Sequence, residues 1–455
     1  MVGRREEKRE YFLRRCRSAA TAALLVSSLA SASARGGETP PASATAEADA
    51  LVAEALARNP DLAASREEAA AARARVSPAG ALPDPMVTVS YENDGWSPSL
   101  GSEAQSRLQF MAQQAIPFPG KLALAERVAK ADAERFATRP ERAALALEGA
   151  VRRGYATLLE ARENLRLVDE QTETWREIEE VIRARYSAGM GTQQDVLRAQ
   201  SEQTRLLQRR RKDEAAVESA LVELRRLLFR PADAAVPTER RLVPGEPLAA
   251  PPADGFLDSA LEATPELKDA ALAKERSRLA EELARRNLRP DFVASAAYMN
   301  RGSLPLMWSA GVGITVPLWA GQKQRPLIAE ARSSFDAASA TETSLRRRAL
   351  ALTEDRLIRI RQLRDESRLD SEALLVQDRL SDDAALASYK TGALPFVTVL
   401  EALGTSFTDR RGAVARLADL LRADADLREF SLDASPSSAA MPKSSAPSAG
   451  SAPKM

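Results

Sequence analysis

The chain has 455 residues, of which 44% are hydrophobic, 28% charged and only 5% aromatic, and its formal net charge is +1. It contains no histidine and one cysteine, Cys16. Because imidazole and thiolate are the usual general base, nucleophile and metal ligand, the common hydrolytic triads and zinc sites are excluded. The composition is typical of long amphipathic helices packed side by side, and the charge indicates no nucleic-acid partner.

Residues 1–34 have the pattern of a secretory signal peptide. A basic segment precedes an apolar run from Ala19 to Ala30, and the small residues Ala32-Ser33-Ala34 suit a signal peptidase. The alternative is a basic tail before an ordinary helix. Removal of the signal would also remove Cys16, so the mature chain is expected to have no thiol and no lipid-modified cysteine.

The rest of the chain consists of two copies of one plan. Tyr186-Ser187-Ala188-Gly189 matches Tyr389-Lys390-Thr391-Gly392 at an offset of 203 residues, and Ile116-Pro117 matches Val316-Pro317 nearby. Such self-similarity predicts tandem structural repeats. We expect a first repeat over residues 47–230, an irregular proline-rich connector over 231–255, a second repeat over 256–430 and a disordered Ser/Ala/Pro tail over 431–455.

Each repeat is expected to contain two long helices. The predicted ranges are about 121–187 and 192–230 in the first repeat, and about 323–389 and 396–430 in the second. Apolar or small residues recur every seven positions, as at Leu147, Gly154, Ala161 and Val168, and Val151 and Leu158 belong to a second stripe. Two stripes indicate neighbours on more than one side, as in the wall of a tunnel, although an ordinary coiled coil would also produce them.

A pair of β-strands is expected before each long helix, at about 86–93 and 106–116 and again at about 291–300 and 306–316. Apolar and polar residues alternate there, which is the pattern of a strand with lipid on one side and water on the other, or of a half-buried soluble hairpin. The export signal favours membrane strands. The expected lipid-facing positions are Val87, Val89, Tyr91, Leu108, Phe110, Leu306, Trp308, Val312 and Ile314.

Four strands cannot close a membrane barrel, because open edges are not tolerated in lipid and the smallest barrels have about eight strands. Oligomerisation is therefore required. A dimer would supply eight strands and a trimer twelve, and the sequence pattern alone does not choose between them.

With its duplicated plan, its Pro117-Phe118-Pro119-Gly120-Lys121 segment and its two turn motifs, the chain resembles the TolC-like outer-membrane factor family over residues 47–430. Around Tyr389-Lys390-Thr391-Gly392-Ala393-Leu394-Pro395 it is most similar to the heavy-metal and multidrug efflux branch. The resemblance implies a mainly α fold with a small membrane β part. It further implies a homotrimer whose twelve strands form one barrel in the outer membrane above a periplasmic helical tunnel, with a periplasmic adaptor and an inner-membrane pump as partners.

The resemblance also assigns roles to the two helical turns. The adaptor-contact positions it implies are Gly189, Met190, Gly191, Gly392, Ala393 and Leu394, although the glycines are equally explained as helix C-caps. The implied periplasmic entrance ring consists of Glu401 and Asp195, with Thr398 at a position that is acidic in the family pattern. Asp195 could instead be a favourable charge at a helix N-terminus.

The sequence thus predicts a passive efflux conduit with no enzymatic activity, no cofactor and no metal site. The alternative is an exported coiled-coil structural or adhesive protein without a pore. A periplasmic carboxylate-based enzyme would need a cluster of acids, which the spacing does not show. Because an upstream pump would select the substrate, the transported molecule is not encoded in this chain.

Overall fold

The computed structural model describes residues 44–101, 103–236, 238, 240–245, 264–430 and 432. The predicted signal peptide lies outside these residues, as do nearly all of the predicted tail and part of the predicted connector. The described residues, which begin at Ala44, form one compact unit.

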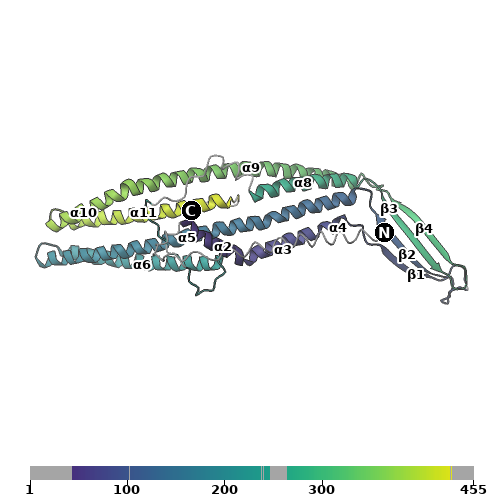
Figure 1. Cartoon of the computed structure of the whole chain (residues 1–455), viewed down its shortest axis with the longest axis horizontal. Helices are drawn as coiled ribbons and strands as arrows, with labels where there is room; N and C mark the ends of the chain where they lie inside the picture. Colours follow the sequence, from purple (N-terminus) through teal and green to yellow (C-terminus); the bar gives the residue numbers. More distant parts are fainter. Residues whose placement is uncertain are drawn as a thin grey trace, which may run out of the picture. The chain divides into compact units, whose positions relative to one another are not determined.

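This unit is mainly helical, with one small sheet (Figure 1), which confirms the predicted fold class. In each half, shorter helical segments lead to two strands, a long helix follows, and a second helix returns. The helices are α2 (Ala44–Arg58), α3 (Pro60–Ala74), α4 (Val76–Gly80), α5 (Lys121–Ser187), α6 (Gln193–Leu227), α8 (Pro265–Arg286), α9 (Gln324–Leu369), the π-helical turn η1 (Asp370–Leu374), α10 (Leu375–Thr391) and α11 (Phe396–Glu429).

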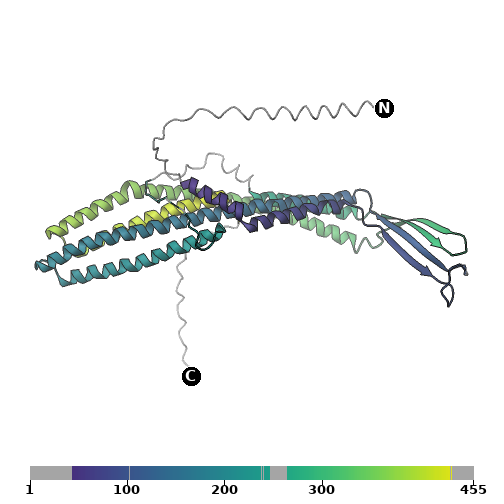
Figure 2. The same cartoon turned by 60° about the horizontal axis from the view of Figure 1, so that its bottom comes forward.

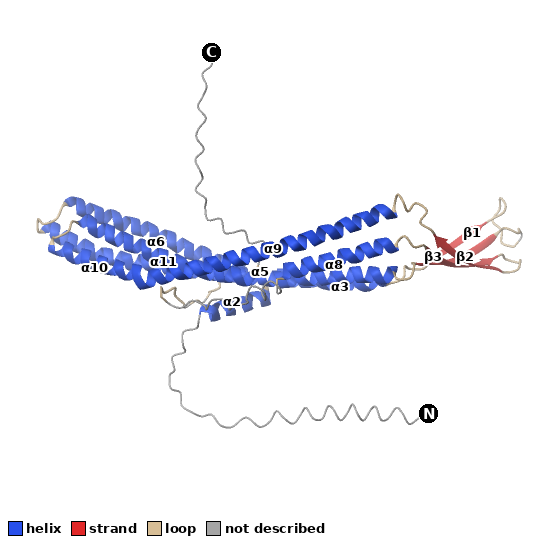
Figure 3. Ribbon diagram, turned by 90° about the horizontal axis from the view of Figure 1, so that it is seen from above, coloured by secondary structure: helices blue, strands red, loops and turns tan. Residues whose placement is uncertain are grey.

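Helix α5 is the central element of the unit. It has 67 residues and therefore extends about 100 Å at 1.5 Å per residue. Its apolar stripes are buried against several neighbours, because α3, α6, α8 and α11 all pack on it, as the view in Figure 3 shows for the adjacent helices. Val151, Leu158 and Val168 lie in one core with Leu224 of α6 and Val414 of α11. The two stripes therefore pack against neighbouring helices on two sides of α5.

The second long helix differs from the expected continuous helix over 323–389. It is interrupted by η1, where Asp370 is buried (5% exposed). Arg416 of α11 holds this carboxylate with two hydrogen bonds, from Nε to Oδ2 (2.5 Å) and from Nη2 to Oδ1 (2.6 Å). A π-turn adds one residue to the helix, and here it coincides with the side chain that pairs with α11.

The four strands form one antiparallel sheet in the order β1 (Met86–Glu92), β2 (Arg107–Ile116), β3 (Asp291–Asn300) and β4 (Met307–Thr315). Strands β2 and β3 come from different halves of the chain, so their pairing joins the two halves. Figure 2 shows the strands extending beyond the ends of the helices.

The Pro117–Lys121 segment forms the junction between sheet and helices. Gly120 has φ of +89°, a left-handed conformation that favours glycine, and α5 begins directly after it. Lys121 Nζ donates to Asp291 Oδ1 and to the Arg289 carbonyl, both at 2.8 Å. The Phe118 amide donates to the same Asp291 oxygen at 2.7 Å, so this segment ties the first half to the start of β3.

Among the described helices, none combines the length and the apolar content that a membrane-crossing helix needs.

Candidate membrane face and entrance turns

One face of the sheet is apolar and exposed. The register places Val89 opposite Phe110, Phe110 opposite Tyr298, and Tyr298 opposite Trp308. Val312 is 81% exposed, although apolar side chains of this size normally lie inside a protein. We call this surface the apolar face; its apolar members are Val87, Val89, Tyr91, Leu108, Phe110, Ala112, Ile116, Phe292, Ala294, Ala296, Tyr298, Trp308, Ala310, Val312 and Ile314, and Gln114 and Asn300 lie among them.

The register brings together eight of the nine predicted lipid-facing positions, and the ninth, Leu306, is exposed just before β4. Sequence reasoning missed Phe292 and Tyr298 in β3. Alternation is weak there because Val293, Ala297 and Met299 on the opposite face are also apolar. Pairing β3 with the clearly alternating β4 would have revealed them.

The opposite surface, here called the polar face, carries mainly small and polar side chains. Ser295 lies opposite Gln113 and Gly311, and Ser309 lies opposite Ala297. Its other members include Thr88, Ser90, Gln109 and four methionines, Met86, Met111, Met299 and Met307. A sheet with one exposed apolar face and one polar face suits lipid on one side and water on the other.

The two helical turns lie at the same end of the helices, away from the sheet (Figures 1 and 3). Gly189, between α5 and α6, has φ of +72°, and Gly392, between α10 and α11, has φ of +82°. Both glycines end a helix in the left-handed conformation, as the C-cap interpretation requires. Met190 is exposed (67%) at the tip of the first turn.

Arg185, near the end of α5, connects the two turns. Its Nη1 donates to the Tyr389 carbonyl at 2.5 Å, and its Nη2 lies 3.4 Å from the Met190 carbonyl oxygen. The guanidinium carbon also lies 4.9 Å from the centre of the Tyr389 ring, within cation–π range. Sequence reasoning missed this residue, because its partner is 204 positions away.

Replacing Arg185 with alanine should loosen the second turn. The amides of Gly392 and Ala393 bond to carbonyls of α10 and should exchange with solvent about tenfold faster, because a hydrogen bond from a charged group contributes about 1.5 to 3 kcal/mol. Hydrogen exchange of peptides covering residues 388–394 measures this. Arg183→Ala, which removes an arginine paired with Glu179 on its own helix, should leave the exchange unchanged; equal protection in both variants would refute the connection.

An aromatic cluster lies behind the turns. The Phe396 ring meets Trp175 edge-on at 6.1 Å and lies 5.8 Å from Tyr389. Burial, and then the charge of Asp195, raise the pKa of the Tyr389 hydroxyl, while Arg185 opposes the rise. The hydroxyl is therefore neutral at physiological pH.

The predicted ring residues occupy different settings. Asp195 forms a capping box with Thr192 at the start of α6. The Asp195 amide donates to the Thr192 hydroxyl oxygen at 3.2 Å, and Asp195 Oδ2 accepts from that hydroxyl at 2.8 Å. This supports the helix N-terminal interpretation. Thr398 lies in the first turn of α11, half-buried, and Glu401 is exposed one turn later.

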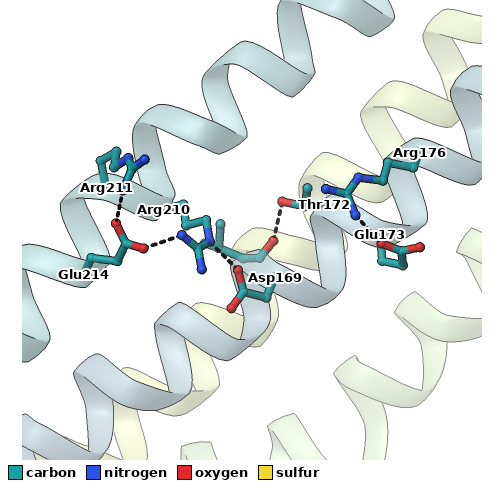
Figure 4. A network of polar contacts seen from close by, with 8 residues as sticks. Asp169, Thr172, Glu173, Arg176, Arg210, Arg211 and Glu214 are labelled. Carbon is teal, nitrogen blue, oxygen red and sulfur yellow. Dashed lines mark hydrogen bonds and ion pairs between the residues drawn. The ribbon is translucent and has the colours of Figure 1, made fainter.

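Charged residues elsewhere on these helices pair with one another. Figure 4 shows Arg210 of α6 between Asp169 of α5, at 2.7 Å, and Glu214 of its own helix. Such ion pairs on solvated helix faces are structural and individually weak. Within the described residues, no three His, Cys, Asp or Glu side chains form a group that could hold a metal ion.

Comparison with known proteins adds the family. The model of the outer membrane efflux protein family matches residues 51–228 and 256–431, whereas no curated protein matches the chain. Among solved structures, the outer membrane protein VceC of Vibrio cholerae has a TM-score of 0.71 at 18% identity, covering 84% of this chain and 95% of that one. The MtrE channel of Neisseria gonorrhoeae, in its open state, has a TM-score of 0.71 at 18% identity, covering 84% of this chain and 88% of that one. The CmeC channel of Campylobacter jejuni has a TM-score of 0.71 at 15% identity, covering 84% of this chain and 85% of that one.

Proposed function

Since this chain belongs to the outer membrane efflux protein family, we propose that three copies assemble into one channel-tunnel that carries solutes out of the cell. As a member of the family it is an outer-membrane efflux channel subunit with its helices in the periplasm. The trimer, its partners and the roles of individual residues are the parts that we propose.

The exposed apolar face is the observation that carries the proposal. A monomer in water would expose all of it, which soluble proteins avoid. Within the described sheet, β1 and β4 each pair along one edge only, and an unpaired edge is not tolerated in lipid. Three copies would pair these edges and close a barrel of twelve strands, with the apolar face toward lipid and the polar face toward the lumen.

The turns at the far end of the helices suit the periplasmic entrance. Gly189, Met190 and Gly191, with Gly392, Ala393 and Leu394, would there contact a periplasmic adaptor that couples the channel to an inner-membrane pump. The pump would supply the energy, so we propose that the subunit is a passive duct and not an enzyme.

Glu401 is the acidic residue best placed to act on the permeating ions. Three exposed copies near the entrance would form a ring of negative charge that attracts cations. Glu401→Gln should therefore move the potassium-to-chloride permeability ratio toward unity in single-channel recordings. Glu173→Gln, which neutralises an exposed carboxylate paired with Arg176 on α5, is the control; equal selectivity in wild type and Glu401→Gln would refute the ring.

Planar-bilayer recording of the purified protein tests the function itself. A channel subunit gives discrete conductance steps of one main size, whereas an adhesive or structural coiled coil gives none. Absence of conductance from protein extracted as a stable oligomer would favour that alternative.

A further inference from the structure

Methionines are concentrated on the polar face of the sheet. Of the five methionines in the described residues, four lie there, one on each strand: Met86 on β1, Met111 on β2, Met299 on β3 and Met307 on β4. The fifth, Met190, is in the turn between α5 and α6. The remaining members of this face are mostly serine, threonine, glutamine and glycine, so the methionines do not belong to a general apolar surface.

The strand register brings these four side chains into one line. Met299 is directly opposite Met307. Met111 is opposite Ala297, two positions from Met299, and Met86 is opposite Gln113, two positions from Met111. Direct and diagonal neighbours on one face of a sheet are within about 5 and 8 Å, which long side chains can span. We call this line the thioether stripe.

Packing alone does not account for the stripe. Methionine usually fills gaps in cores, and Met299 is indeed buried (8% exposed), but Met307 is 41% and Met86 is 55% exposed. Thioether sulfur is a soft, uncharged ligand that selects Cu(I) among the metals available to cells. Several thioethers in reach of one another on a wet surface form a ligand set for such a cation.

We propose that the thioether stripe binds soft monovalent cations, Cu(I) and Ag(I), on their way out through the channel. Met299 and Met307 form the primary pair, Met111 is the third ligand, and Met86 continues the line toward the helices. The assignment rests on the proposed function, because it requires the polar face to line the lumen.

The Arg301 guanidinium competes with a bound cation for the Met307 sulfur. Its Nη1 donates to Met307 Sδ at 3.5 Å and its Nη2 donates to the Ala104 carbonyl at 2.7 Å. A bound cation would have to displace this guanidinium from the sulfur and tolerate its charge. Binding is therefore weakened by Arg301, which suits a cation that must leave again.

Competition titration of Cu(I) against a chromogenic chelator, on the mature protein purified from the outer membrane in detergent, tests the proposal. Met299→Leu/Met307→Leu preserves apolar volume and should fold normally. It should lower the affinity for Cu(I) by more than about tenfold, because replacing residues that only support metal ligands already lowers metal affinity by about tenfold or more. Arg301→Gln should raise the affinity, and Met190→Leu should leave it unchanged. Cys16 is expected to leave with the signal peptide, so no thiol should compete with the thioethers in the mature protein.

The oligomer and its conductance are measured on the same samples. A conducting oligomer that binds no Cu(I), or binds it equally well in wild type and in the double variant, would overturn the thioether stripe and leave the proposed function intact. Tight Zn(II) binding at the same residues would also overturn it, because thioethers do not favour that ion over Cu(I). Failure to form any conducting oligomer would instead count against the proposed function.

Discussion

Replacing Val312 with arginine should prevent stable insertion of the protein into the outer membrane. Val312 lies in the middle of β4 on the apolar face and is 81% exposed. An arginine facing lipid near the middle of the bilayer costs about 2 to 4 kcal/mol, and an oligomer incurs this cost in every copy. Immunoblotting of the outer-membrane fraction should show the variant at a small fraction of the wild-type level.

Ser309→Arg provides the matched control, because Ser309 is exposed on the same strand but on the polar face. An arginine there would face a water-filled lumen, so this variant should assemble normally. Wild-type levels of Val312→Arg in the outer membrane, or equal loss of both variants, would contradict the assignment of the two faces.

Glu429→Gln should cause a large loss of stability in the helical part of the molecule. Glu429, the last residue of α11, is buried (7% exposed), and its carboxylate accepts from Arg142 at 2.8 Å and from Arg153 at 2.5 Å on α5. Burial would lower the pKa of Arg153, but its bonds to Glu429 and Asp426 raise it. Gly149 leaves the space for this carboxylate, since an added Cβ would lie 2.2 Å from Glu429 Oε2.

Loss of that carboxylate charge leaves two partly buried guanidinium groups without their common partner. Removing one member of a buried pair costs about 3 to 5 kcal/mol, and the partial exposure of the arginines reduces this to about 2 to 3 kcal/mol. Urea unfolding followed by circular dichroism measures the change. Asp424→Asn, which breaks a pair with Arg428 within one helix turn, should have little effect; equal unfolding midpoints for Glu429→Gln and wild type would refute the role of this cluster.

The sequence was sufficient for the fold class because its signals are periodic. Seven-residue stripes and two-residue alternation reveal helices and strands without any knowledge of their partners. The pairing of β2 with β3 was not predicted, because it joins residues that are far apart in the chain, such as Phe110 and Tyr298. The η1 interruption was not predicted for the same reason, because it coincides with an ion pair between Asp370 and Arg416, which lie on different helical segments.

The site was predicted less completely than the fold. Alternation located the apolar face on three strands, but Arg185 and Glu429 act through residues more than 200 positions away, and no local pattern marks such partners. For Asp195 the sequence left two interpretations open, and its capping box with Thr192 supports the local one. The entrance ring and the adaptor contacts remain proposals, because they depend on neighbouring subunits.

The size of the species extracted from the outer membrane tests the central claim most directly. After chemical cross-linking and gentle detergent extraction, the outer-membrane fraction should contain a three-subunit species whose electrophoretic mobility changes on heating, as expected of a closed oligomeric barrel. A soluble monomer or dimer, with no protein in the outer-membrane fraction, would contradict the account and would show that the apolar face does not lie in lipid.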